Sequence, residues 1–191
     1  MRKPLKIGIV VGSTRPRRRA LSVAEWVRER CRERDDVEVE LIDLLEQDLP
    51  LLDEELPAAY GCYEHEHTRA WARRIEPFDG FVFVVPEYNR SLPAALKNAL
   101  DYLYAEWHDK AAGFVSYGID AGGARAIEHL RTVMGELRVA DVRAQVALSL
   151  FEEFDDERFA PHERRGSELD RLLDQLVPWA GALREVRNAD R

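Results

Sequence analysis

The sequence predicts an α/β domain in which a doubly wound sheet of five parallel strands carries helices on both faces. Five short apolar segments alternate with stretches that show the helical repeat of apolar residues, and this alternation runs along all 191 residues. Strands separated by helices favour parallel pairing with right-handed crossovers. The predicted strands are residues 5–11, 37–42, 80–85, 112–117 and 142–150.

Three of these strands are expected in the centre of the sheet. Segments 5–11, 80–85 and 112–117 are nearly continuous apolar runs, which is typical of strands covered on both faces. Segment 37–42 alternates apolar and glutamate side chains, as a half-exposed strand does. We therefore expect it at an edge.

Helical spacing of apolar residues marks the segments between the strands. One stripe contains Val23 and Val27, and another runs through residues 126–137. Between them, a helix after the third strand has Ser91 as candidate N-cap. Ser167 has the features of a capping-box start for the last helix.

Composition favours a single domain over residues 1–191. Hydrophobic residues make up 46% and charged residues 34%, which supplies enough apolar material for one core at this length. The formal net charge is −8. A field of that sign repels polyphosphate backbones unless cations cluster locally, so no nucleic-acid partner is expected.

The sequence also argues against a membrane or secreted protein. No stretch approaches the run of about 20 apolar residues that a spanning helix requires. The first apolar segment is too short for a signal peptide, and arginines follow where a cleavage site should lie. Cys31 and Cys62 lack metal-ligand spacing. We expect a cytoplasmic protein.

The turn after the first strand predicts an anion site. Residues 12–20 read GSTRPRRRA, at the carboxyl edge where open α/β sheets bind ligands. Ser13 and Thr14 offer hydroxyls, and the start of the next helix offers free N–H groups. Guanidinium groups match phosphate oxygens. A solvated run of charge at a helix start is the alternative interpretation, most of all for Arg17 and Arg19 taken singly.

Other nucleotide and metal motifs are absent from the sequence. The loop has neither the GxxxxGK[ST] pattern of a triphosphate loop nor the GxGxxG dinucleotide fingerprint. The run EHEH at residues 64–67 does not place its histidines on one helical face, so we expect no metal site. It should lead into a helix at 68–75 with Trp71 and Ile75 facing inward.

The turn after the third strand carries the most specific motif. Residues 86–101 read PEYNRSLPAALKNALD, a polar turn that offers N–H groups, an amide and an aromatic edge to a planar ligand. With the GSTR loop, it closely resembles the NAD(P)H-dependent FMN reductase family of flavodoxin-like quinone and azo-dye reductases. The resemblance extends over roughly residues 5–150 and includes SYG at 116–118 and GGARA at 122–126.

The resemblance implies a flavodoxin-like fold and a noncovalent FMN site. The phosphate would be held by Ser13, Arg15 and the helix start near Arg18. The isoalloxazine would be bordered by Pro86, Glu87, Tyr88 and Asn89. The side near its pyrimidine edge would be lined by Ser116, Tyr117 and Gly118. Many relatives have short polar residues in place of Arg18 and Ala20, so the sequence leaves the separate roles of Arg17, Arg18 and Arg19 open.

By the same resemblance, the protein is expected to pass hydride from NAD(P)H through FMN to a second acceptor, such as a free flavin, a quinone or an azo compound. Two alternatives stay open: an electron carrier like flavodoxin without nicotinamide turnover, and a flavin-free interaction protein on the same fold. A homodimer is expected, with the helix after Ser91 as one candidate face. The acceptor, the choice of NADH or NADPH, the pairing of dimers into tetramers and the role of segments 44–67 and 152–165 are left open.

Overall fold

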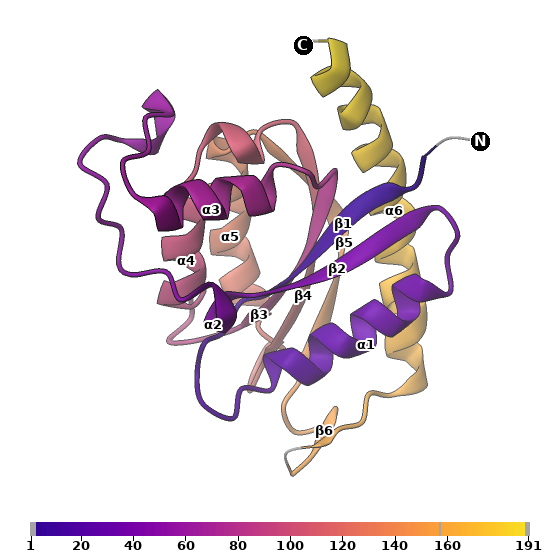
Figure 1. Cartoon of the computed structure of the whole chain (residues 1–191). Helices are drawn as coiled ribbons and strands as arrows, with labels where there is room; N and C mark the ends of the chain where they lie inside the picture. The colour runs from indigo at the N-terminus through magenta and orange to yellow at the C-terminus, as the bar shows by residue number, and fades with distance from the viewer. Residues whose placement is uncertain (1–2, 157, 190–191) are drawn as a thin grey trace.

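Five parallel strands form the central sheet in the order β2-β1-β3-β4-β5 (Figure 1). The computed structural model describes residues 3–156 and 158–189. The strands are β1 Leu5–Val11, β2 Val37–Asp43, β3 Gly80–Pro86, β4 Lys110–Gly118 and β5 Val139–Ser149. Each neighbouring pair is parallel. The predicted sheet is confirmed, and its strand order reverses direction between β1 and β3, where ligands bind in such sheets.

Helices cover both faces of the sheet, as predicted. On one face lie α1 (Ala20–Arg32) and α6 (Glu163–Ala189), and on the other lie α3 (Glu66–Ile75), α4 (Ala94–Asp101) and α5 (Ala124–Glu136) (Figure 1). The connections add α2 (Leu44–Gln47), two 3₁₀ turns at Ala58–Tyr60 and Ala105–Trp107, and a small antiparallel hairpin of β6 (Phe154–Asp155) and β7 (Arg158–Phe159). None of the helices in the described ranges has the length and apolar character needed to cross a membrane.

The sheet separates two apolar layers. Successive side chains of a strand point to opposite faces, so Ile9 packs with α1 and α6 while Val10 packs with α3, α4 and α5. Strands β3 and β4 are buried throughout their length, and β1 at all but one position. The outer strand β2 alternates buried with exposed residues. Central and edge positions therefore follow the predicted pattern.

Two predicted helix starts are wrong. Helix α4 begins at Ala94 with Pro93 at the N-cap and no side-chain cap, because Ser91 closes the preceding turn with Tyr88 through the main chain. Helix α6 begins at Glu163 rather than near Ser167. Its first turn is held by Arg165, whose guanidinium contacts the buried carboxylate of Glu153 at 2.6 Å. In both cases a contact outside the helix determines where it starts.

The segment between β2 and α3 is fastened to α4. Asn98 donates to the carbonyl of Pro50 at 2.7 Å and accepts from the N–H of Leu52 at 2.9 Å. The hydroxyl of Tyr102 donates to the carboxylate of Asp53 at 2.9 Å. Helix α3 follows with Trp71 and the last residue, Ile75, buried, as predicted. The amide of Asn98 is thus used within the fold.

Candidate functional site

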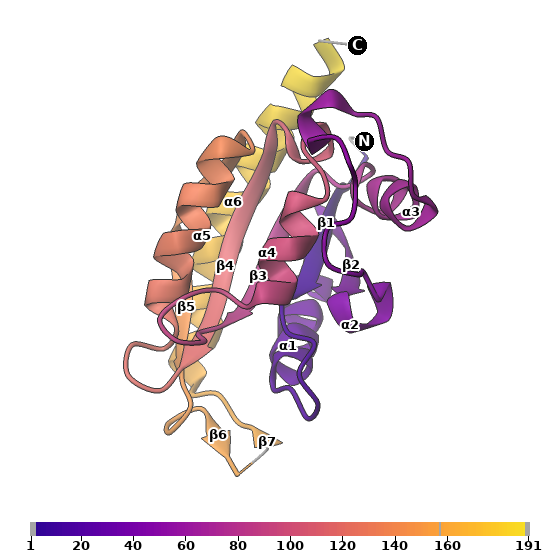
Figure 2. The same ribbon diagram turned by 90° about the vertical axis from the view of Figure 1, so that its left-hand side faces the viewer.

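A cleft of about 550 Å³ lies at the carboxyl ends of β1, β3 and β4. The loops that form it gather at the end of the sheet that also carries the β6–β7 hairpin (Figure 2). Its lining residues are Arg15, Pro16, Arg17, Arg18, Arg19, Pro86, Glu87, Tyr88, Tyr117, Gly118, Ile119 and Leu150. Most of the predicted site residues are among them, while Ser13, Asn89 and Ser116 are not.

Ser13 lies beneath the cleft rather than on its surface. Its buried Oγ is 2.8 Å from the hydroxyl oxygen of Tyr88, and the N–H of Arg15 donates to the same Oγ at 3.4 Å. The preceding residue, Gly12, donates its N–H to the carbonyl of Val84 at 2.9 Å. The hydroxyl of Ser13 therefore joins the loop after β1 to the turn after β3.

The arginines that line the cleft differ in their contacts. Arg18 forms an ion pair with Asp43 at the end of β2. The guanidinium carbon of Arg19 lies 4.8 Å from the ring centroid of Phe154, and its NH2 donates to the carbonyl of Asp156. Arg15 and Arg17 are exposed, and their side chains form no hydrogen bond or ion pair within residues 3–156 and 158–189.

The start of α1 adds an uncapped helix end to this loop. Arg19 occupies the N-cap without a side-chain cap hydrogen bond. The first N–H groups of a helix have no partner in the helix, and its dipole is positive there. The buried Nε of Arg18 also has no hydrogen-bond partner among the described residues. An anion at this loop remains a prediction, with which these free donors are compatible.

The turn after β3 has a backbone that few residues adopt. Tyr88 and Ser91 exchange main-chain hydrogen bonds of 2.9 and 3.0 Å, and Asn89 and Arg90 between them have φ values of 50° and 67°. Two left-handed residues in succession are typical of a type I′ turn, and asparagine tolerates that conformation. Asn89 is exposed at the tip, next to the cleft.

Glu87 binds the start of α5. One carboxylate oxygen is 2.8 Å from the guanidinium of Arg125, and the other accepts the main-chain N–H of Arg125 at 3.2 Å. The N–H of Glu87 donates to the carbonyl of Tyr117 at 3.0 Å. Glu87 thus holds the turn after β3 against the loop after β4. This role of Arg125 could not be predicted from the local sequence, because the two partners are 38 residues apart.

The end of β4 packs closely on the loop before α5. Ser116 is buried, and its Oγ donates to the carbonyl of Gly122 at 2.7 Å. A Cβ on Gly118 would come within 2.8 Å of the main-chain nitrogen of Gly123. Glycine at 118 and 123 therefore permits two backbones to approach, while Ser116 is engaged within the fold. Its predicted contact with a ligand remains a prediction.

Tyr117 forms part of the apolar floor. It is buried, and burial raises the pKa of its hydroxyl, against the opposing effects of the Ala20 main chain and of the positive charges of Arg19 and Arg15. The tyrosine is therefore neutral at physiological pH. Its ring centroid lies 6.1 Å from that of Phe154, so the β6–β7 hairpin packs beside the floor.

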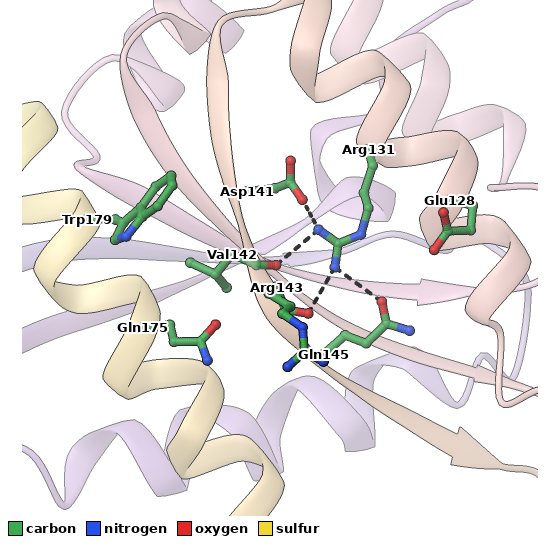
Figure 3. A pocket seen from close by; sticks show the side chains of 8 residues that line it. All are labelled: Glu128, Arg131, Asp141, Val142, Arg143, Gln145, Gln175 and Trp179. Carbon is green, nitrogen blue, oxygen red and sulfur yellow. Dashed lines mark hydrogen bonds and ion pairs between the residues drawn. The ribbon is translucent and has the colours of Figure 1, made fainter.

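A larger hollow, of about 780 Å³, lies between α5, β5 and α6 (Figure 3). Arg131 donates to the carbonyl of Val142 at 3.0 Å and forms an ion pair with Asp141, while Gln175 accepts the N–H of Ala144 at 3.0 Å. Arg131 and Gln175 thus form hydrogen bonds with main-chain groups of the edge strand β5. Such contacts protect an edge strand from pairing with a strand of another molecule. No predicted site residue lies in this hollow.

The histidines of the EHEH run lie apart from the cleft. His65 and His67 stack at 5.1 Å between ring centroids, and His67 contacts the carboxylate of Asp53 at 2.9 Å. In the part of the chain that the structure describes, no three His, Cys, Asp or Glu side chains gather as metal ligands would.

The fold and the cleft together define a doubly wound α/β protein with an arginine-lined cleft at the switch point of its sheet. The family model of NADPH-dependent FMN reductases matches residues 5–153. The chain belongs to this family.

Individual relatives agree with this membership. An NAD(P)H-dependent FMN reductase of Schizosaccharomyces pombe, C4B3.06c, is 42% identical over 147 residues, which cover 76% of this chain and 73% of the relative. A 2-hydroxy-1,4-benzoquinone reductase of a Burkholderia species is 32% identical over 141 residues, which cover 71% of this chain and 73% of the relative. Among solved structures, the flavoenzyme FerB of Paracoccus denitrificans shares the fold with a TM-score of 0.72 at 23% identity, over 93% of this chain and 98% of FerB.

The residues of the cleft fit an FMN molecule. Arg15, the uncapped start of α1 and the unpartnered Nε of Arg18 suit a phosphate group. Pro86, Tyr117 and Leu150 supply apolar surface for a planar ring system. The volume lies within the range of about 300–1,000 Å³ that is usual for such ligands.

Proposed function

We propose that the cleft binds FMN without a covalent bond, with its phosphate at the loop before α1 and its ring between the turn after β3 and the end of β4. As a member of its family, the protein is an FMN-dependent oxidoreductase that uses NAD(P)H. The observation that carries the proposed site is the convergence of Arg15, the uncapped α1 start and Tyr88 on one cleft.

Each part of the chain then has a defined task. Arg15 donates to phosphate oxygens as a planar fork, and Arg18, held by Asp43, can present its Nε to the same group. Main-chain N–H groups of the turn after β3 orient the ring. Tyr117 stays neutral beneath it. When bound, FMN supplies hydride acceptance and delivery, so the chain needs no acid or base of its own.

The second substrate is a small-molecule electron acceptor, and we propose a quinone as its class. The supporting observation is the printed activity of the Burkholderia relative, a 2-hydroxy-1,4-benzoquinone reductase. Nicotinamide and quinone rings are both planar, and one exposed face of the ring could receive each in turn.

We propose that the protein works as a homodimer. Large apolar side chains are exposed on the segment between β2 and α3, among them Leu51 at 81% and Tyr60 at 70% exposure. Leu51 also lines a cavity of about 360 Å³ that reaches from Thr14 to Ala94 and Ala95 of α4. A second copy would remove this apolar surface from water. Sedimentation of the wild type and of Leu51→Asp tests the proposal, since a monomeric wild type contradicts it.

We also propose a cytoplasmic location. Cys31 is buried and Cys62 is exposed, and both are free thiols in the structure. Free thiols are usual in a reducing compartment.

Anaerobic mixing of the FMN-loaded protein with NADPH tests the function. Prompt loss of the visible flavin absorbance supports the oxidoreductase, whereas a stable yellow solution supports an electron carrier. Failure to bind FMN would favour a flavin-free interaction protein. With a quinone as second substrate, parallel lines in double-reciprocal plots are expected, because donor and acceptor use the same ring face in turn.

A further inference from the structure

The sequence leaves the separate roles of Arg17, Arg18 and Arg19 open, and the different contacts of these side chains distinguish them. We propose that Arg17 binds the 2′-phosphate of NADPH and thereby makes the protein prefer NADPH to NADH. This inference rests on the proposed FMN site and adds a residue that chooses between the two nicotinamide donors.

Two of the arginines in the cleft are already engaged by the protein. Arg18 is paired with Asp43, whose carboxylate is buried at the end of β2. Arg19 lies on the ring of Phe154 and donates to the carbonyl of Asp156. Neither guanidinium can move to the rim of the cleft without breaking these contacts. Among the arginines that line the cleft, this leaves Arg15 and Arg17 to recognise a second phosphate group.

Arg15 is exposed, but its main chain is held at the inner end of the loop, next to the buried Ser13. Its main-chain N–H contacts the buried Oγ of Ser13 at 3.4 Å. Its charge acts on the hydroxyl of Tyr117 at the floor, where it lowers the pKa against the larger effect of burial. This position suits the phosphate of FMN, which the uncapped start of α1 also faces.

Arg17 lies at the tip of the loop. The N–H of Arg18 donates to the carbonyl of Arg15 at 3.1 Å and closes a turn around Pro16 and Arg17. Arg17 has a φ of 55°, in the left-handed region that favours glycine. Its exposed side chain forms no hydrogen bond or ion pair in the described ranges, so no internal contact offsets this conformation. The guanidinium of Arg17 lines the cleft and is therefore available to an external ligand.

The chemistry of that ligand follows from charge. FMN carries one phosphate group, which Arg15 and the helix start can bind. A nicotinamide that stacks on the ring from solvent brings its adenosine to the outside of the cleft. NADPH differs from NADH there by a single phosphomonoester, which a guanidinium fork matches. In a protein of net charge −8, such a group needs a local cation.

Arg17→Gly removes the side chain without disturbing the turn, since glycine adopts this φ readily. The control is Arg138→Gly, because Arg138 has a φ of 53° and is also exposed, but precedes β5 at the opposite end of the sheet, where its guanidinium is paired with Asp109 at 2.8 Å. The measurements are kcat/KM for NADPH and for NADH, the Kd for FMN, and the affinities of the loaded protein for 2′,5′-ADP and 5′-AMP. The two probes differ only in the 2′-phosphate and report without turnover.

We expect Arg17→Gly to lower kcat/KM for NADPH at least about tenfold, the effect of one lost charge-assisted hydrogen bond. In the same variant, kcat/KM for NADH and the Kd for FMN should stay within about twofold of wild type. In Arg138→Gly, both kcat/KM values, the Kd for FMN and the nucleotide affinities should stay within the same limit. The preference for 2′,5′-ADP over 5′-AMP should disappear in Arg17→Gly and be partly kept in Arg17→Lys.

Equal losses for both donors, or an unchanged ratio, would overturn the assignment. A rise in the Kd for FMN would assign Arg17 to the flavin phosphate instead. Failure of the proposed function is seen separately, as a wild type that binds FMN but oxidises neither donor. The nucleotide probes then still decide the role of Arg17.

Discussion

Ser13 and Tyr88 are 75 residues apart in the sequence, and their hydroxyl oxygens lie 2.8 Å apart. Ser13 leaves β1 and Tyr88 leaves β3, so this hydrogen bond joins the loop that carries the arginines to the turn that borders the cleft. Ser13 is buried, which makes its pairing matter, because a buried hydroxyl without a partner destabilises the fold. The two walls of the cleft are thereby fixed relative to each other.

Tyr88→Phe should lower the free energy of unfolding by about 1 kcal/mol, because it leaves the Ser13 hydroxyl with only the long contact to the Arg15 N–H. Urea unfolding of the protein without FMN measures this. Ser13→Ala and the double variant complete a cycle, in which we expect a coupling of about 1 kcal/mol. Additive effects would show that the two hydroxyls do not interact.

Arg15→Ala should raise the Kd for FMN about tenfold or more, since one charge-assisted hydrogen bond contributes about 1.5–3 kcal/mol. Fluorescence titration of free FMN measures the Kd. Arg138→Ala removes an equal charge at the far end of the sheet and should leave the Kd unchanged. If Arg15→Ala bound FMN as tightly as this control, Arg15 would have no place in the site.

Gly118→Ala should destabilise the protein by about 1–3 kcal/mol, because its Cβ would meet the main-chain nitrogen of Gly123 at 2.8 Å. Neither backbone can give way without opening the end of β4. Gly135→Ala is the matched control: it lies in α5 with nothing within 4 Å of the added Cβ. That variant should gain about 0.4–1 kcal/mol. Thermal unfolding compares the two, and equal shifts would contradict the close packing at Gly118.

Lys110 should make stability depend on pH in the alkaline range. Its buried Nζ donates to the carbonyls of Ile75 and Glu76 at 2.8 and 3.0 Å, and burial lowers its pKa to about 7. The unfolded chain has a lysine pKa of about 10.4. Between these values the unfolded state binds more protons, so stability rises as the pH rises through this window, and the full cost of the buried charge applies below it.

Lys110→Met provides the comparison for this effect. We expect the stability of wild type relative to the variant to increase by roughly 1–3 kcal/mol between pH 7 and pH 9. Urea unfolding at several pH values measures the difference. A constant difference over this range would mean that Lys110 titrates near its ordinary pKa.

Much of the sheet could be predicted because burial on both faces leaves a local signature. The predicted segment 5–11 coincides with β1, and the second and third strands extend one residue further than predicted. The prediction fell short at the start of β4, where Lys110 does not look like a strand residue. It also fell short at β5, whose register with β4 shifts opposite residues 112–114. A buried lysine and a bulge depend on neighbours that a local pattern does not contain.

The site was predictable as a set of residues but not as a set of contacts. The motifs identify the loops because phosphate-binding turns need glycine, hydroxyls and cations in sequence. The motifs do not predict the ion pair of Arg18 with Asp43 or that of Glu87 with Arg125. Nor do they predict that the guanidinium of Arg19 packs on the ring of Phe154. Each partner comes from another element of the fold. Which of the neighbouring arginines is engaged within the protein therefore depends on which carboxylate or aromatic ring the fold places beside it.

By itself, the sequence determined the five strands of the sheet and the main helices that alternate with them, the position of the loop of arginines after β1 and the family. Periodicity and short motifs, on which these predictions depend, are properties of neighbouring residues. The tertiary structure alone decided which hydroxyls are hidden and which cations stay free for a ligand. The hydroxyl of Ser116 is hydrogen-bonded to the carbonyl of Gly122, and that of Ser13 to the hydroxyl of Tyr88. The side chains of Arg15 and Arg17, in contrast, face solvent. The physical reason is that desolvation and hydrogen bonding act between residues brought together by folding, whatever their separation along the chain.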